Sequence, residues 1–173
     1  MAAGGAARGL ERVAGRLAAL AEAAPSEEVC GLVVERAGGA LEVVPIRNAA
    51  GDGQGPGGGA ARRHAFVLDP REHLAVERRI REQGGRVAAL YHSHVDAPAR
   101  LSAADREALT VGGGPALPGA DLVVLSTRSG KVTKIAVFRW SGARFGPVAA
   151  LRVPRGDAPR QHAPRRPASR RRA

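Results

Sequence analysis

The sequence predicts an α/β or α+β domain in which a mixed β-sheet lies between helices. Runs of β-branched residues, typical of buried strands, alternate along the chain with amphipathic segments of helical period. The alternation is not a regular strand–helix–strand repeat, because two pairs of expected strands are joined by short turns. At 173 residues the chain is long enough for one domain with a real hydrophobic core.

The first expected element is a helix. Apolar residues recur every three or four positions from Leu10 to Leu20, and Pro25 ends this pattern. Two β-branched runs, 29–36 and 40–47, then flank a short Gly-Gly turn. That arrangement predicts a β-hairpin after the helix.

A loop, a strand and a second helix are expected next. Residues 48–63 are rich in glycine, which predicts a flexible loop rather than a phosphate cradle, since no lysine or helix start follows in the required register. Residues 64–69, HAFVLD, predict a third strand. Pro70 suits the first position of a helix, and Gly84 suits its end.

The second half of the domain is expected to complete the sheet. Residues 86–94, RVAALYHSH, predict a buried strand, and residues 102–110, SAADREALT, predict a short helix. Residues 121–140 contain two apolar runs around RSGK, which predicts a second hairpin. Residues 143–153 predict an edge strand that Pro147 weakens.

The C-terminal segment is strongly basic. From residue 152 to residue 173 there are eight arginines and one aspartate, a charge of +7 out of the net +11 of the chain. The segment has almost no apolar residues and frequent proline, so we expect a disordered tail, 152–173, after a folded domain, 1–151. The tail could contact nucleic acid or an acidic partner, although it lacks base-stacking aromatics, and a solvated extension in an arginine-rich chain is an equal alternative.

The cysteine content and the N-terminal residues indicate the cellular compartment. Cys30 is the only cysteine, which excludes an intramolecular disulfide and a thiolate zinc cage within one chain. Because it lies in an apolar run, we expect it to be an inert side chain rather than a nucleophile. The N-terminal residues mix arginine and glutamate with apolar residues, unlike a signal peptide or a membrane span, so we expect a cytoplasmic protein with no membrane partner.

The stretch HSHVDAPARLSAAD, residues 92–105, contains a potential metal site. Residues two apart on a strand point to the same face, so His92 and His94 would offer two imidazole nitrogens to one ion. Asp105 is the expected third ligand, and Asp96 is a less well-spaced stand-in. Zinc accepts histidine and carboxylate ligands, and a catalytic zinc keeps one position for water.

Hydrolysis at such a site also needs a proton carrier and an oxyanion donor. Glu27 and Glu28 both precede the apolar run 29–36, and on spacing alone either could move the proton from water to the leaving amine. The hydroxyl of Ser102 could stabilise an oxyanion. Ser102 and Asp105 also have the spacing of a helix capping box, which is compatible with both chemical roles because a helix N-terminus favours negative charge.

This pattern resembles the H-x-H-x7-S-x-x-D signature of the JAMM (MPN-plus) metalloprotease family. The segment EVCGL, residues 28–32, is similar to the upstream glutamate segment of bacterial members, and the similarity extends over roughly residues 10–140. The resemblance implies a cytidine-deaminase-like fold and one zinc ion, Zn2+, held by His92, His94 and Asp105.

The resemblance further implies that Glu28 is the general base and acid and that Ser102 supports the oxyanion. Small bacterial members are similar to enzymes that trim ubiquitin-like sulfur-carrier proteins. The implied activity is therefore cleavage of a peptide or isopeptide bond at a carrier's C-terminal Gly-Gly, for example with release of cysteine. The alternative is a catalytically weak scaffold or binding module of the same fold, whose basic tail contacts nucleic acid or an acidic partner.

Some features depart from the family pattern or lie outside it. Val95 stands where the family usually has proline, so we expect a looser loop before Ser102 but retained activity. His64, His73 and His162 are expected at the surface or at helix caps. Substrate specificity would lie in two loops, 51–60 and 111–120, neither of which carries a readable code.

Overall fold

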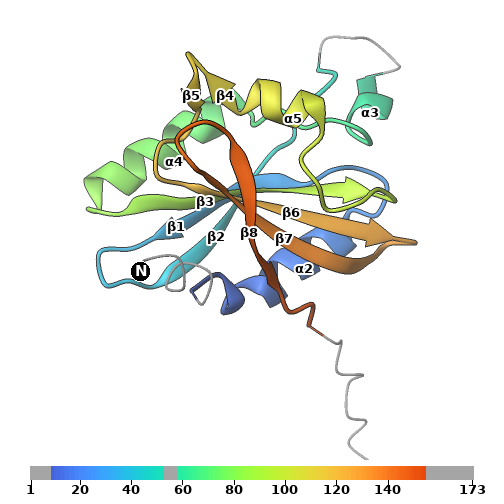
Figure 1. Ribbon diagram of the computed structural model, residues 1–173, viewed down its shortest axis with the longest axis horizontal. Helices are drawn as coiled ribbons and strands as arrows, with labels where there is room; N and C mark the ends of the chain where they lie inside the picture. The colour runs from blue at the N-terminus through green and yellow to red at the C-terminus, as the bar shows by residue number, and fades with distance from the viewer. Residues whose placement is uncertain (1–8, 53–57, 155–173) are drawn as a thin grey trace, which may run out of the picture.

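A computed structural model of the chain describes residues 9–52 and 58–154 (Figure 1). Its main strands are β1 (Cys30–Glu35), β2 (Leu41–Ile46), β3 (Arg86–Val95), β6 (Asp121–Arg128), β7 (Lys131–Trp140) and β8 (Phe145–Leu151). Its helices are α2 (Ala14–Ala23), α3 (Gly58–Ala61), α4 (Pro70–Glu82) and α5 (Ala103–Ala108), and a small hairpin is formed by β4 (Thr110–Val111) and β5 (Gly114–Pro115).

The six main strands form one mixed sheet in the order β2-β1-β3-β6-β7-β8. Both predicted hairpins are present, since β1 pairs antiparallel with β2 and β6 pairs antiparallel with β7. The one parallel pair is β3 with β6, and the connection between them carries α5 and the β4–β5 hairpin. The fold predicted from the sequence, a mixed sheet between helices, is confirmed (Figure 1).

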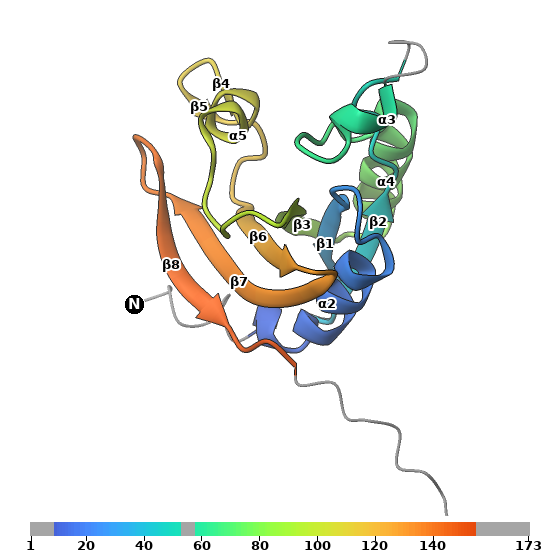
Figure 2. The ribbon, with the colours of Figure 1, turned by 90° about the vertical axis from the view of Figure 1, so that its right-hand side faces the viewer.

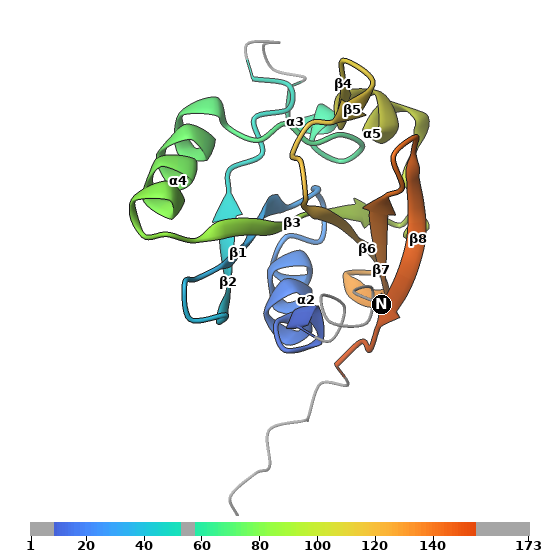
Figure 3. The same cartoon turned by 60° about the vertical axis from the view of Figure 1, so that its left-hand side comes forward.

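One face of the sheet is covered by α2, as Figure 3 shows. The apolar positions of this helix pack on alternate residues of the central strands, because strand residues two apart share a face. The largest fully buried side chains of this layer are Leu10, Leu17, Tyr91, Leu125 and Ile135. We call this layer the α2 face.

The opposite face carries α4, α5 and the β4–β5 hairpin, and it is called the site face below (Figure 2). Helix α4 begins where expected. The carboxylate of Asp69 accepts hydrogen bonds from the N–H groups of Arg71 and Glu72, and Pro70 occupies the first turn. It ends before Gly84, which has a φ of 64°. The apolar core of this face includes Leu32, Leu90 and Val124.

The close packing of β1 against its neighbours requires a glycine. A Cβ atom on Gly31 would lie 2.8 Å from the hydroxyl oxygen of Tyr91 and would overlap the carbonyl oxygen of Val44. Any side chain at this position would therefore push β1 away from β2 or β3.

The strand predicted for residues 64–69 is wrong. Only Leu68 forms a bridge there, with Asn48, and residues 64–67 are irregular. The N–H of Val67 donates to the side chain of Asn48, at 3.1 Å, rather than to a neighbouring strand. The apolar pattern that suggested a strand instead reflects the inward-facing Phe66, which packs against the core of the site face.

Both edges of the sheet carry a proline. Pro45 lies in the edge strand β2, and Pro147 lies in β8 at the other edge, where β8 forms as predicted. Proline is tolerated at these positions because an edge strand leaves some backbone groups unpaired.

The described chain ends just beyond the predicted domain boundary. Val153 still packs against the core of the α2 face, and the N–H of Arg152 donates to the carboxylate of Glu11. The rest of the predicted tail, 155–173, lies outside the described residues, as do residues 53–57 of the predicted Gly-rich loop. Within the described ranges, no helix is long and apolar enough to cross a membrane.

Candidate metal centre

Strand β3 brings two histidines to the site face. Its residues alternate between the two faces, so Leu90, His92 and His94 point the same way while Tyr91 and Ser93 point toward the other side. The side chain of His92 is fully buried and that of His94 is 8% exposed. Burial of this kind restricts each ring to a narrow range of orientations.

Helix α5 places a carboxylate opposite these rings. Its first turn is a complete capping box, in which the Ser102 hydroxyl oxygen accepts from the N–H of Asp105 at 3.0 Å and the Asp105 carboxylate accepts from the N–H of Ser102 at 2.7 Å. The predicted cap is therefore present. It also fixes the direction of the Asp105 side chain, which is 8% exposed.

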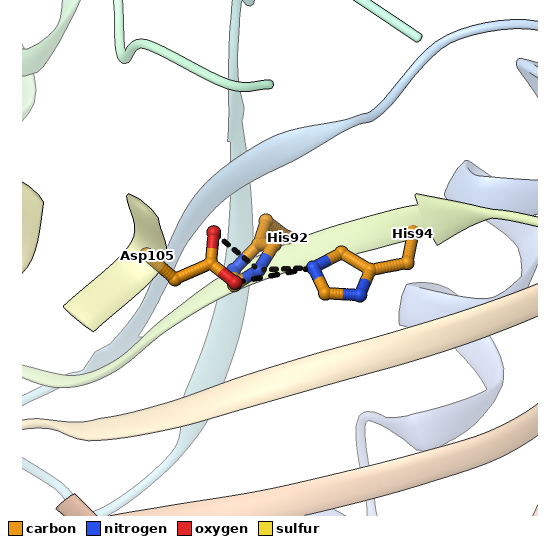
Figure 4. A group of neighbouring side chains, drawn as sticks. All are labelled: His92, His94 and Asp105. Atoms are coloured by element: carbon orange, nitrogen blue, oxygen red, sulfur yellow. Dashed lines mark hydrogen bonds and ion pairs between the residues drawn. The ribbon is translucent and has the colours of Figure 1, made fainter. Parts of the chain in front are cut away.

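The three predicted ligands converge, as Figure 4 shows. The Nε2 atoms of His92 and His94 lie 3.1 Å apart, and oxygens of Asp105 lie 3.6 Å and 3.3 Å from them. A tetrahedral zinc with bonds of about 2.0–2.1 Å would space its ligand atoms about 3.3 Å apart. The donor set and its spacing therefore fit a metal ion such as zinc.

The histidine rings are held so that each Nε2 can serve as a ligand. The Nδ1 of His94 lies 2.8 Å from the carbonyl oxygen of Pro98, which can only accept, so this nitrogen carries the proton. The ring of His92 stacks on Phe66 with 4.3 Å between centroids. Burial lowers the pKa of His92 and so favours the neutral ring, which has a free lone pair.

The charge of Asp105 is stabilised within the site. Burial opposes ionisation of the carboxyl group, but its hydrogen bonds with His92 and His94 outweigh that effect and lower its pKa. The same contacts raise the pKa of His94 despite the burial of its ring. Asp105 is thus a carboxylate, the form in which it can bind a cation.

The structure distinguishes the two candidate glutamates. Glu28 is 5% exposed and lines a cavity of about 360 Å³ together with His94, Ser102 and Asp105. Glu27 instead has an exposed side chain that pairs with Arg62 at 3.1 Å. Burial raises the pKa of Glu28 to about 8, and the nearby Asp105 carboxylate adds to that shift. Of the two glutamates, Glu28 is therefore the one that lies beside the triad.

Ser102 lies on the wall of the same cavity and is exposed to it. Its hydroxyl oxygen already accepts the capping hydrogen bond from the N–H of Asp105. The hydroxyl hydrogen remains free to donate to a bound substrate, because a hydroxyl can accept and donate at once. The capping role and the predicted oxyanion role are thus geometrically compatible.

Asn48 is a buried polar residue beside the site that was not singled out from the sequence. Its side-chain amide is buried and makes four hydrogen bonds, donating to the carbonyl oxygens of Glu28 and Ala65 and accepting from the N–H groups of Ala50 and Val67. These bonds use the full capacity of the amide. Asn48 thereby fixes the backbone of Glu28. It also fixes the residues on either side of Phe66, whose ring stacks on His92. An asparagine two residues after an apolar strand was the available signal.

Ser93 ties the glutamate segment to the ligand strand. Its hydroxyl oxygen accepts from the N–H of Val29 at 2.9 Å, and its own N–H donates to the carbonyl oxygen of Val29 at 2.9 Å. Val29 directly follows Glu28 in the chain. The serine between the two histidines therefore holds the segment of Glu28 beside the strand that carries His92 and His94.

Two hydroxyls of β6 hold the loop that follows His94. Thr127 donates to the carbonyl oxygen of His94 at 3.2 Å, and Ser126 donates to that of Ala97 at 2.6 Å. Val95 is buried and continues the strand, in register with Thr127. The loosening expected from valine in place of proline is thus opposed by these side-chain hydrogen bonds.

The remaining candidates lie apart from the triad. Asp96 faces Arg63 and the N–H of Ser129, so it is not a stand-in ligand. Burial raises the pKa of Cys30 to about 12, consistent with an inert thiol. His73 is half-buried and lies 3.3 Å from Glu77, and His64 is exposed at the rim of the cavity.

The family described as prokaryotic homologs of the JAB domain matches residues 10–140 of the chain. No curated protein sequence matches it. A solution structure of a protein from Desulfitobacterium hafniense is 27% identical with a TM-score of 0.51, over 76% of this chain and 83% of that chain. A solution structure of a protein from Salinibacter ruber is 26% identical with a TM-score of 0.46, over 82% and 87% of the two chains.

Proposed function

The chain belongs to the family of prokaryotic homologues of the JAB domain, which includes zinc isopeptidases, and from that membership we propose that it is a zinc-dependent hydrolase. Its substrate is a peptide or isopeptide bond at the C-terminal Gly-Gly of a small ubiquitin-like sulfur-carrier protein, for example one with cysteine attached. The observation that carries the proposal is the buried His92, His94 and Asp105 group with Glu28 on the same cavity wall.

The proposed metal is zinc, held by His92, His94 and Asp105. When bound there, zinc supplies a Lewis acid that polarises the scissile carbonyl and makes water nucleophilic near neutral pH. The fit rests on two imidazole nitrogens and one carboxylate about a tetrahedral edge length apart.

Glu28 acts as the proton carrier in this proposal. Its carboxylate takes a proton from the attacking water, and the resulting acid gives that proton to the departing amine as the C–N bond breaks. Burial raises the pKa of Glu28, which favours the protonated form from which the departing amine receives its proton. The hydroxyl of Ser102 donates to the oxyanion formed on the substrate, which contributes about 3–4 kcal/mol for one well-placed donor.

The alternative, a scaffold or binding module with a basic tail, has less support. A scaffold would not need a complete set of ligands with a proton carrier and a hydroxyl beside them, and this chain retains all of them. We therefore propose the enzyme as the primary function.

The deciding experiment compares Glu28→Gln with wild-type protein. We expect about one bound zinc per chain in both, measured by mass spectrometry of the metal, because Glu28 is not a ligand. Cleavage of a carrier protein with one amino acid added after its Gly-Gly should fall by a factor of about 10²–10⁴ in the variant.

Glu27→Gln is the matched control, because Glu27 is the adjacent residue and pairs with Arg62 outside the triad cavity. It should keep both zinc and activity. Full activity of a zinc-loaded Glu28→Gln protein would refute the mechanism, and a wild-type protein that binds no zinc would refute the metal assignment.

A further inference from the structure

The cavity beside the triad has a basic wall. Besides Glu28, His94, Ser102 and Asp105, its lining includes Arg63, His64 and Arg100. Among the described residues that line it, the carboxylates are Glu28 and Asp105, which the proposed function already uses as proton carrier and ligand. Two arginines on one cavity wall favour a bound anion, because the planar guanidinium group binds carboxylates through paired hydrogen bonds.

The two arginines differ in their partners. Arg63 is held by Asp96 at 2.9 Å, and Asp96 also accepts from the N–H of Ser129. Arg100 takes part in none of the ion pairs in the described part of the chain. Its backbone is fixed by a hydrogen bond to the carbonyl oxygen of Pro98, the same oxygen that positions His94. Arg100 is thus a charged side chain without a carboxylate partner, on a positioned loop.

A second cavity, of about 260 Å³, is mainly apolar. It is lined by side chains such as Phe66, Leu90 and Leu109, with His73 also on its wall. It lies close to the triad, because the ring of Phe66 stacks on that of His92. Its mostly apolar wall would desolvate a carboxylate at considerable cost. The basic cavity therefore suits an anion better.

The position of Glu28 assigns that anion to the leaving group. Glu28 gives its proton to the departing amine, so the amine leaves on the side of the basic cavity. In a free amino acid, the α-carboxylate is separated from the amine nitrogen by a single carbon atom. A leaving amino acid would thus present its carboxylate to the arginines as its nitrogen takes the proton.

We propose that Arg100, assisted by Arg63, binds the free α-carboxylate of the amino acid that is released. The protein is then an exopeptidase for a single C-terminal residue. An isopeptide bond to a lysine side chain is a poor substrate for it, because that amine has no carboxylate next to it. This inference rests on the proposed function. The reaction is a hydrolysis, in which water adds to the carbonyl carbon, the C–N bond breaks, and one water proton passes through Glu28 to the amine.

The test uses the zinc-loaded full chain and two substrates. Both are carrier proteins extended by one alanine after the Gly-Gly, one with a free C-terminal carboxylate and one with a carboxamide. Wild-type protein should prefer the carboxylate by about ten- to a hundredfold in kcat/KM. Arg100→Gln should remove most of this preference through KM, and Arg100→Lys should keep part of it.

A binding measurement complements the kinetics. Calorimetric titration with free alanine should show weak binding to wild-type protein and none to Arg100→Gln, with equal zinc content in both. Arg78→Gln, an exposed change on α4, is the control for a lost positive charge and should behave as wild type.

The outcomes separate the two proposals. If wild type cleaves both substrates equally, or if an Arg63→Gln, Arg100→Gln double variant keeps the preference, the carboxylate site is overturned while the hydrolase stands. If wild type cleaves neither substrate, the proposed hydrolase is contradicted, and the carboxylate site falls with it.

Discussion

The two faces of the sheet differ in what they bury. Under α2, the buried layer is mainly apolar, with Leu17, Val33 and Ile135 fully excluded from water. On the site face, the apolar layer stops partway along the sheet, and buried polar groups such as His92 and Asp105 take its place. Both faces are formed by the same strands, so one set of backbone positions supports a hydrophobic core and a polar site.

Strand β3 shows how the difference arises. Toward the α2 face it presents Ala89 and Tyr91, and toward the site face it presents Leu90 and then the two histidines. Burial of ionisable groups costs free energy unless partners compensate for it. Burial of apolar side chains on the α2 face therefore stabilises the fold, and this offsets the free-energy cost of burying the triad on the site face. Three substitutions test this division.

The largest stability effect is expected on the α2 face. Leu17→Ala should lower the free energy of unfolding by about 2–5 kcal/mol, because it removes a fully buried side chain and leaves a cavity. Zinc content and activity per folded molecule should not change. Urea denaturation and metal analysis provide the measurements.

Leu74→Ala is the matched control for this change. Leu74 is 57% exposed on α4, so the same truncation should cost no more than about 0.5 kcal/mol. A Leu17→Ala protein that folds but has lost its zinc would show that the two faces are not separable.

An intermediate stability effect, with a large effect on function, is expected at Asn48. Asn48→Ala leaves the buried carbonyl oxygen of Glu28 without its partner and should lower the free energy of unfolding by about 1–3 kcal/mol. Unlike the Leu17 change, it should also lower kcat per folded molecule, because Glu28 and Phe66 both lose a fixed position. Quenched-reaction assays on protein of known folded fraction would measure kcat per folded molecule.

Asn48→Asp separates the two halves of the Asn48 network. It keeps the acceptor for the N–H groups of Ala50 and Val67 but loses the donor to Glu28. If it restored full kcat, the bond to Glu28 would be irrelevant to catalysis, and the site face would be no more sensitive than the α2 face.

The smallest effect is expected at Glu22, which joins the end of α2 to β7. Its carboxylate accepts from the Nζ of Lys131 at 2.9 Å and from the N–H of Val132 at 3.0 Å, and these bonds lower its pKa. Glu22→Gln should cost less than about 1 kcal/mol, since the ion pair is partly exposed to solvent. Zinc content should not change.

The pH dependence of this effect has a definite sign. A carboxyl with a lowered pKa stabilises the fold above its unfolded-state pKa and loses that contribution as the pH falls through the folded-state pKa. The difference in stability between wild type and Glu22→Gln should therefore be full at neutral pH and shrink in acid. A difference that grew in acid would contradict the assignment of the charge.

The sequence predicted much of the fold because its signals were local. The hairpin turns, the proline at the start of α4 and the capping box at Ser102 all depend on residues close together in the chain. The grouping of His92, His94 and Asp105 followed from strand alternation and one short loop. The segment 64–69 was mistaken for a strand because it is apolar. Its backbone instead bonds to the side chain of Asn48, a contact distant in sequence that local patterns do not reveal.

The choice between Glu27 and Glu28 could not be made from the spacing of residues. It depends on which side chain the hairpin turns inward, and that is set by contacts across the sheet, such as those of Ser93 with Val29. The support of the loop after His94 by Ser126 and Thr127 was hidden for the same reason. Hydrogen bonds between residues some 30 positions apart leave no periodic trace in a sequence.

The prolines at the two sheet edges bear on how the protein behaves at high concentration. An exposed edge strand is a template onto which another chain can add, and repeated addition leads to fibrils. Pro45 and Pro147 each interrupt the row of N–H donors that an incoming strand would need. Each edge of the sheet therefore carries a local obstacle to the edge-to-edge addition of another chain.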